Sequence, residues 1–198
     1  MKRLMYGTVM LTGLLVAGCS TTEVSLSYNR DQTIQRAGTA QPVVEVANVD
    51  DQRKVDVKWL GAVRGGFGNP LKNLEADRPV SELVKTAFES GLSARGLRAE
   101  PGKARVALEL IIRKLDCSQY VRREAHVELD LLLMNLADRR TLFTAPVSVT
   151  KVSGGNIFDV GIFASVEDLR AVMNGALQEA VDKALDNPSL LARLKDGV

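Results

Sequence analysis

The sequence predicts an α+β domain, in which two helices cover one face of a mainly antiparallel sheet of about four to six strands. Three segments, 105–116, 124–133 and 141–152, alternate apolar and polar side chains with the period of two that is typical of half-buried strands. Two others, 79–96 and 165–184, repeat apolar residues at helical spacing. Strands and helices do not alternate regularly along the chain, which argues against a parallel α/β sheet.

The domain is expected to begin at residue 42 and to continue to residue 198. A valine-rich strand is predicted over residues 43–49, before Asp50-Asp51, and a second extended segment over residues 55–63. Gly65 to Pro70 then form a loop. Ahead of the domain, residues 19–41 are rich in Ser, Thr, Gln and Asn, which predicts a flexible tether with at most one short edge strand.

The strands at 105–116 and 124–133 are expected to pair as a hairpin. If the turn sets the register, Arg113 lies opposite Glu124 and Val106 lies opposite Leu131. A second turn at Asp138-Arg139-Arg140 leads into the strand at 141–152.

Both helices carry start and stop signals. Asp77 is a candidate cap for the first helix, with Pro79 in its first turn, and Gly96 ends it. Ser165 and Asp168 resemble a capping box at the start of the second helix. We expect one stripe of that helix to pack on the sheet, comprising Leu169, Met173, Leu177 and Val181.

Composition indicates one globular domain without an electrostatic signature for nucleic acid. The 198 residues are 45% apolar and 25% charged, which excludes disordered and collagen-like chains. The formal net charge is +2, and both surplus cations, Lys2 and Arg3, lie in a segment predicted to be removed. The mature chain is therefore formally neutral, and we expect no nucleic-acid partner.

Residues 1–18 have the pattern of a secretory signal peptide, in which a charged start precedes an apolar run that ends at Ala17. The run is too short for a transmembrane helix, which needs about 20 apolar residues. Leu15-Val16-Ala17-Gly18-Cys19 resembles the lipobox of bacterial lipoproteins. The resemblance implies cleavage between Gly18 and Cys19 and attachment of acyl chains to Cys19. Ser20 after the cysteine implies delivery to the periplasmic face of the outer membrane.

The sequence offers no catalytic, cofactor or metal motif, and we expect no enzyme activity and no cofactor. A single histidine, His126, cannot by itself build a histidine-based metal site, although Glu124, Glu128 and Asp130 share its strand face. This group is either a solvated strand face or a carboxylate–histidine cluster, and the first is favoured. Cys117 is the remaining thiol, and a small semi-buried residue is favoured over a reactive one.

Two apolar features are candidates for contact with a partner. Leu132, Met134 and Leu136 would face away from the helix-covered side of the sheet, either as a partner patch or as a second local core. The second feature is a pair of glycine-rich loops, at 65–70 and 153–163. The latter carries Phe158 and Phe163, which either contact a partner or fold back onto the domain.

The order of these elements resembles one family. A lipobox, an early strand ending in Asp50-Asp51-Gln52-Arg53, and a helix closing in Gly91-Leu92-Ser93-Ala94-Arg95-Gly96-Leu97 are similar to the YajG-like family of bacterial lipoproteins, over residues 15–185. The resemblance implies a periplasmic α+β domain on the outer membrane without established catalytic residues.

Three functions remain open from the sequence. The first is a non-enzymatic binding or scaffold protein for an envelope partner, and the second is a lipid-handling accessory of an envelope transport or assembly system. The third is a hydrolase whose carboxylates converge only in the fold. A large apolar groove beside the second helix would favour lipid handling, whereas a flat exposed patch or an open sheet edge would favour protein binding.

Overall fold

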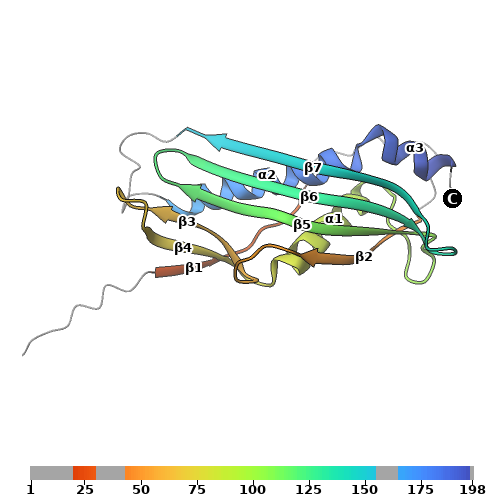
Figure 1. Ribbon diagram of the computed structural model, residues 1–198, viewed down its shortest axis with the longest axis horizontal. Coiled ribbons are helices and arrows are strands. Elements are labelled where there is room, and N and C mark those ends of the chain that lie inside the picture. The colour runs from red at the N-terminus through yellow and green to blue at the C-terminus, as the bar shows by residue number, and fades with distance from the viewer. Residues whose placement is uncertain (1–19, 30–42, 155–164, 197–198) are drawn as a thin grey trace, which may run out of the picture.

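The expected α+β class is confirmed by the computed structural model, which describes residues 20–29, 43–154 and 165–196 (Figure 1). One mixed sheet of seven strands carries two helices on one face, and a short third helix follows. The strands are β1 (Ser20–Val24), β2 (Val44–Asp51), β3 (Trp59–Arg64), β4 (Pro70–Ala76), β5 (Val106–Gln119), β6 (Arg123–Asn135) and β7 (Thr141–Ser153). The helices are α1 (Val80–Ala94), α2 (Val166–Leu185) and α3 (Pro188–Asp196).

The long strand β5 organises the sheet. The strand order is β1-β4-β3-β5-β6-β7, and β2 pairs with β5 as well. β2 runs parallel to the first half of β5, from Val106 to Ile112, and β3 runs parallel to its last residues, from Cys117 to Gln119. Both short strands therefore share one edge of β5, while β5, β6 and β7 form an antiparallel ribbon.

Arg53 fills the break between β2 and β3 along that edge. Its guanidinium donates hydrogen bonds to the backbone carbonyls of Trp59 (2.8 Å) and Leu115 (3.0 Å), and it pairs with Asp51 (2.8 Å). Burial raises the pKa of Asp51, but hydrogen bonds and the charge of Arg53 outweigh burial and leave that pKa lowered. A buried cation thus satisfies carbonyl groups that no neighbouring strand can reach.

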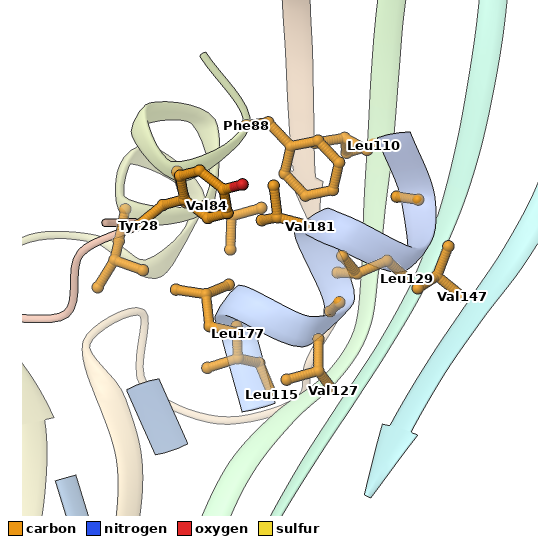
Figure 2. Close-up of a cluster of buried hydrophobic side chains, with 14 of the residues drawn as sticks. Tyr28, Val84, Phe88, Leu110, Leu115, Val127, Leu129, Val147, Leu177 and Val181 are labelled. Carbon is orange, nitrogen blue, oxygen red and sulfur yellow. The ribbon is translucent and has the colours of Figure 1, made fainter. Parts of the chain in front are cut away.

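The core lies between the sheet and the helices (Figure 2). Figure 2 shows Val84 and Phe88 of α1 and Leu177 and Val181 of α2 facing a layer of aliphatic side chains from β5, β6 and β7. The predicted stripe of α2 is confirmed, because Leu169, Met173, Leu177 and Val181 have no exposed surface.

The two helices approach closely at Gly91. A Cβ atom at this position would lie 2.6 Å from Val181 Cγ1 and 2.9 Å from Leu185 Cδ1, so only glycine fits without a shift. One turn later, the buried Arg95 donates to Asp182 on α2 (2.9 Å) and to Asp186, the residue that follows α2 (2.7 Å). Burial lowers the pKa of Arg95, but its hydrogen bonds to Asp186, Asp182 and Tyr28 outweigh burial. The pKa is therefore raised, and the side chain remains a cation.

The segment after β1 lies along α2 and is bound by four polar side chains of that helix. They are spaced four residues apart, at Arg170, Asn174, Gln178 and Asp182. Tyr28 donates to Asp182 (2.7 Å), and its hydroxyl accepts from Arg95 (3.1 Å). The other three bonds join Arg170 to Ser25 O (3.2 Å), Asn174 to Ser27 N (2.8 Å) and Gln178 to Ser27 O (3.4 Å). The expected edge strand is present, and residues 20–29 pack on the domain where the sequence predicts mostly tether, since Val24, Leu26 and Tyr28 are buried.

The predicted hairpin register is wrong. Val106 pairs with Asn135, not Leu131, and Leu131 pairs with Leu110. The strands continue to Gln119 and Arg123, which leaves a turn of only three residues, 120–122, and moves every pair. A bulge at Arg113 shifts the register once more, and this side chain pairs with Asp130 (2.7 Å), not with Glu124.

Three local expectations also need correction. Residues 55–58 are not part of a strand, and β3 begins only at Trp59. The strand β4 was not predicted, because Pro70–Ala76 shows little alternation, and it raises the number of described strands to seven. Asp77 does not cap α1, since its carboxylate pairs with Arg78 and Pro79 occupies the cap position without a side-chain bond.

Candidate functional site

The face of the sheet opposite to α2 carries the predicted patch. Figure 1 is viewed from this side, with α2 running behind the long strands. Leu132 and Met134 alternate with the buried Leu131 and Leu133, so they point away from the helices, as the sequence predicts. Both are half-buried, and Leu136 just beyond β6 is 41% exposed. We call these three residues the distal patch.

Polar and charged neighbours border the distal patch. Leu132 lies between Glu109 on β5 and Thr144 on β7, and Met134 lies between Ala107 and Thr141. Towards the middle of the sheet, Arg113 and Asp130 form an ion pair on the same strands. An apolar centre with a charged rim is the usual composition of a protein-binding surface.

The β7 edge of the sheet is poorly suited to pairing with another strand. In the described part of the chain, β7 pairs only with β6. The carbonyl oxygen of Ser148 accepts a hydrogen bond from Lys183 Nζ of α2 (2.9 Å). Pro146 has no backbone N–H and stands two residues earlier, so it has the same orientation in the strand. Both features hinder the pairing of another strand with β7, so the face of the sheet next to β7 is the better candidate for partner contact.

A second apolar group lies at one end of the sheet, on two neighbouring turns. Phe67 in the β3–β4 turn is fully exposed, and Tyr120 and Val121 in the β5–β6 turn are 44% and 57% exposed. The Tyr120 hydroxyl donates to the carbonyl oxygen of Gly66 (2.7 Å), which joins the two turns. We call Phe67, Tyr120 and Val121 the tip residues. The sequence places Phe67 in one of the two glycine-rich loops that are candidates for apolar contact. It does not single out Tyr120 and Val121, although two apolar residues in a three-residue turn are a signal for them.

The two titratable candidates, Cys117 and His126, lie on opposite faces of the sheet, and Cys117 is buried where the sequence predicts a semi-buried residue. Cys117 is buried, and burial, followed by the charge of Asp116, raises the pKa of its thiol to about 12. His126 lies on the uncovered face, with Nδ1 3.2 Å from Thr150 Oγ1 and Nε2 3.8 Å from Glu124. Within residues 20–29, 43–154 and 165–196, no group of three histidine, cysteine or acidic residues is arranged to hold a metal ion.

Two surface depressions formed by described residues are lined by both polar and apolar groups. The larger, about 480 Å³, lies beside the start of α2, where Glu167 and Arg170 pair next to β1. The other, about 370 Å³, lies near the end of α1 and includes Glu45, Glu89 and Arg98. Because charged side chains take part in both linings, neither of these two depressions is a purely apolar groove of the kind that would favour lipid handling.

Several predicted positions lie outside the described residues, namely Gly18, Cys19, Phe158 and Phe163. Their proposed roles in lipid attachment and partner contact therefore stay predictions. Among the helices of the described residues, none combines the length and apolar character that a membrane span requires.

Solved structures with TM-scores above 0.5 show the shared fold, and others match less well. A crystal structure of a Xanthomonas campestris protein of the DUF330 family superimposes with a TM-score of 0.65 at 13% identity, over 89% of this chain and 100% of that one. Another, of an uncharacterized protein, gives 0.54 at 10% identity, over 85% and 99%. A minor lipoprotein from Acinetobacter baumannii gives 0.38 at 8% identity, over 75% and 91%.

Sequence comparison shows the family. None of the curated proteins matches this chain. The pattern of one protein family, described as "Uncharacterized lipoprotein", matches residues 32–195, which is most of the sequence. Lipoproteins are attached to a membrane through covalently bound lipid. The chain belongs to this family of uncharacterized lipoproteins.

Proposed function

We propose that this lipoprotein is anchored through Cys19 to the periplasmic face of the outer membrane, and that it acts there as a non-enzymatic binding or scaffold protein of the cell envelope. The observation that carries the proposal is the distal patch, in which apolar side chains lie on a sheet face that α1 and α2 leave open. Membership of the family supports a lipid anchor, and the lipobox supports Cys19 as its position. The YajG-like resemblance supports the outer membrane.

The distal patch favours a protein partner over a lipid. It is a surface of a twisted sheet rimmed by Glu109 and the Arg113–Asp130 pair, and neither of the two depressions described above includes its residues. Such a surface provides area for association and a charged border for specificity. It provides no nucleophile, base or oxyanion site for a reaction, because its centre consists of Leu132, Met134 and Leu136.

A photo-reactive amino acid placed at position 134 in intact cells tests the proposal. We expect a discrete crosslinked protein species, and we expect Leu136→Glu in the same chain to abolish it, because a buried unpaired charge opposes association. The matched control is position 57, whose valine is 56% exposed and whose carbonyl oxygen accepts from the start of α1, away from the patch.

The outcomes separate the candidate functions. Equal crosslinking at 134 and 57, or an adduct that Leu136→Glu leaves unchanged, would show that the patch binds no specific protein. An adduct with lipid in place of protein would favour the lipid-handling function.

The position of the anchor has its own test. Cys19→Ser removes the thiol that forms the thioether, so the variant should retain its signal peptide and incorporate no fatty-acid analogue. Cys117→Ser is the control, and it should be acylated normally because this thiol is buried within the domain. Acylation of the Cys19→Ser chain would refute the assignment.

A further inference from the structure

The tip residues lie at the end of the sheet where the anchored terminus enters it. A row of paired residues crosses the whole sheet at this end, comprising Ser20, Lys72, Val63, Gln119, Arg123 and Ser153. The β3–β4 and β5–β6 turns extend beyond this row, and Figure 1 shows them at the end of the long axis where the chain enters β1. Neighbouring strands are about 4.8 Å apart, so Ser20 lies roughly 15 Å across the sheet from β5.

Ser20 is also the residue that follows the proposed lipidated cysteine. Consecutive Cα atoms are about 3.8 Å apart, so acyl chains on Cys19 begin next to this row. The strand β1 starts at Ser20, and the segment after it is bound to α2 through Ser25, Ser27 and Tyr28. No spacer therefore separates the anchored residue from the packed domain, and the membrane must lie close to this end of the sheet.

The composition of the two turns fits a bilayer surface. The β3–β4 turn reads Gly-Gly-Phe-Gly-Asn and the β5–β6 turn reads Tyr-Val-Arg, so neither contains a carboxylate. Aromatic side chains are favoured at the level of the lipid headgroups, and an arginine can keep its charge in the headgroup region while its stem lies among apolar groups. An exposed phenyl ring on a glycine-rich turn has no packing role in the domain itself, since Phe67 contacts solvent on all sides.

We propose that Phe67, Tyr120 and Val121 insert into the surface of the membrane that carries the Cys19 anchor, and that they hold the domain upright on it. This inference rests on the proposed anchor. The hydrogen bond between Tyr120 and Gly66 makes the two turns one contact surface, and the anchor beside β1 adds a further point of attachment. Acyl chains on one residue provide a single point of attachment and do not orient a domain, whereas several contacts across the sheet end fix its direction.

An upright domain presents the distal patch away from the bilayer. Leu132 lies nine residues along β6 from Arg123, which belongs to the row at the membrane end. At roughly 3.4 Å per residue, the patch lies about 30 Å from that row. The proposed protein partner would therefore be bound in the periplasm at a fixed height, and not at the lipid surface.

The test uses the acylated full-length lipoprotein in vesicles of phosphatidylethanolamine and phosphatidylglycerol that contain doxyl-labelled lipid. Val121→Cys places an environment-sensitive fluorophore at the tip, and Ala137→Cys places it in the β6–β7 turn at the other end. The native Cys117 is buried and does not compete for the label. We expect quenching by doxyl lipid to be several-fold greater at position 121 than at position 137. Phe67→Ser should reduce quenching at 121, whereas the exposed control Val57→Ser should leave it unchanged.

Three results would overturn the inference, and they are distinguishable. Equal quenching at 121 and 137 in a chain whose Cys19 carries acyl groups, verified by mass spectrometry, would show that the anchored domain has no preferred orientation. Unchanged quenching in Phe67→Ser would remove Phe67 from the contact. Absence of acyl groups on Cys19 would refute the proposed anchor, and this inference with it.

Discussion

Gly91→Ala should destabilise the domain although alanine is the better helix former. In a helix interior, replacement of glycine by alanine normally stabilises by about 1 kcal/mol. At Gly91 the new Cβ would lie 2.6 Å from Val181 Cγ1, whereas carbon atoms pack at about 3.5–4.0 Å. The valine cannot turn away, because its χ1 angle is strongly restricted in a helix. Overpacking of this kind costs about 1–3 kcal/mol, which leaves a net loss of up to about 2 kcal/mol.

Gly175→Ala is the matched control on α2. Its Cβ would meet only the end of the Lys151 side chain, with Cε at 3.2 Å, and this side chain is flexible and half-exposed. The same gain in helix propensity should therefore appear without the clash, as a stabilisation of up to about 1 kcal/mol.

Urea unfolding followed by circular dichroism measures both variants. The free energy of unfolding of Gly175→Ala should exceed that of Gly91→Ala by about 1–3 kcal/mol, with equal slopes against urea concentration. Because both substitutions change helix propensity equally, the difference isolates the contact between α1 and α2. A difference below about 0.5 kcal/mol would mean that the helices separate freely at this point and would refute the close approach at Gly91.

Further predictions concern the core, the buried thiol and the pH dependence. Leu177→Ala should lower the free energy of unfolding by about 2–5 kcal/mol, measured in urea, and a loss below about 0.5 kcal/mol would place this side chain at the surface. Cys117 should not react with thiol reagents at pH 8 until urea unfolds the chain, because burial raises its pKa to about 12. Asp51 has a lowered pKa in the folded state, so its contribution to stability is present above the ordinary aspartate pKa of about 4 and is lost as the pH falls below it. The stability difference between wild type and Asp51→Asn should therefore shrink between pH 6 and pH 3, as unfolding at each pH would show; a constant difference would contradict the Arg53 pairing.

Local patterns in the sequence determined the class of the fold and most of its elements. The period of two in β5, β6 and β7 and the helical stripe of α2 each report which face of an element is buried, and burial dominates the stability of such elements. For the same reason, the outward direction of Leu132 and Met134 followed from alternation alone. The lipobox is a linear motif and needs no tertiary structure to be recognised.

Only the tertiary structure decided the features that depend on contacts between distant residues. The strand β4 shows little alternation, and its pairing with β1 and β3 gives it a place in the sheet. The hairpin register depended on a three-residue turn and a bulge at Arg113, and one extra residue shifts every later pair. Arg53 and Arg95 appear in the sequence as ordinary surface cations, and their buried roles arise because backbone carbonyls and carboxylates from remote elements converge on them. The meeting of Phe67, Tyr120 and Ser20 at one end is likewise a product of strand order, which no local pattern encodes.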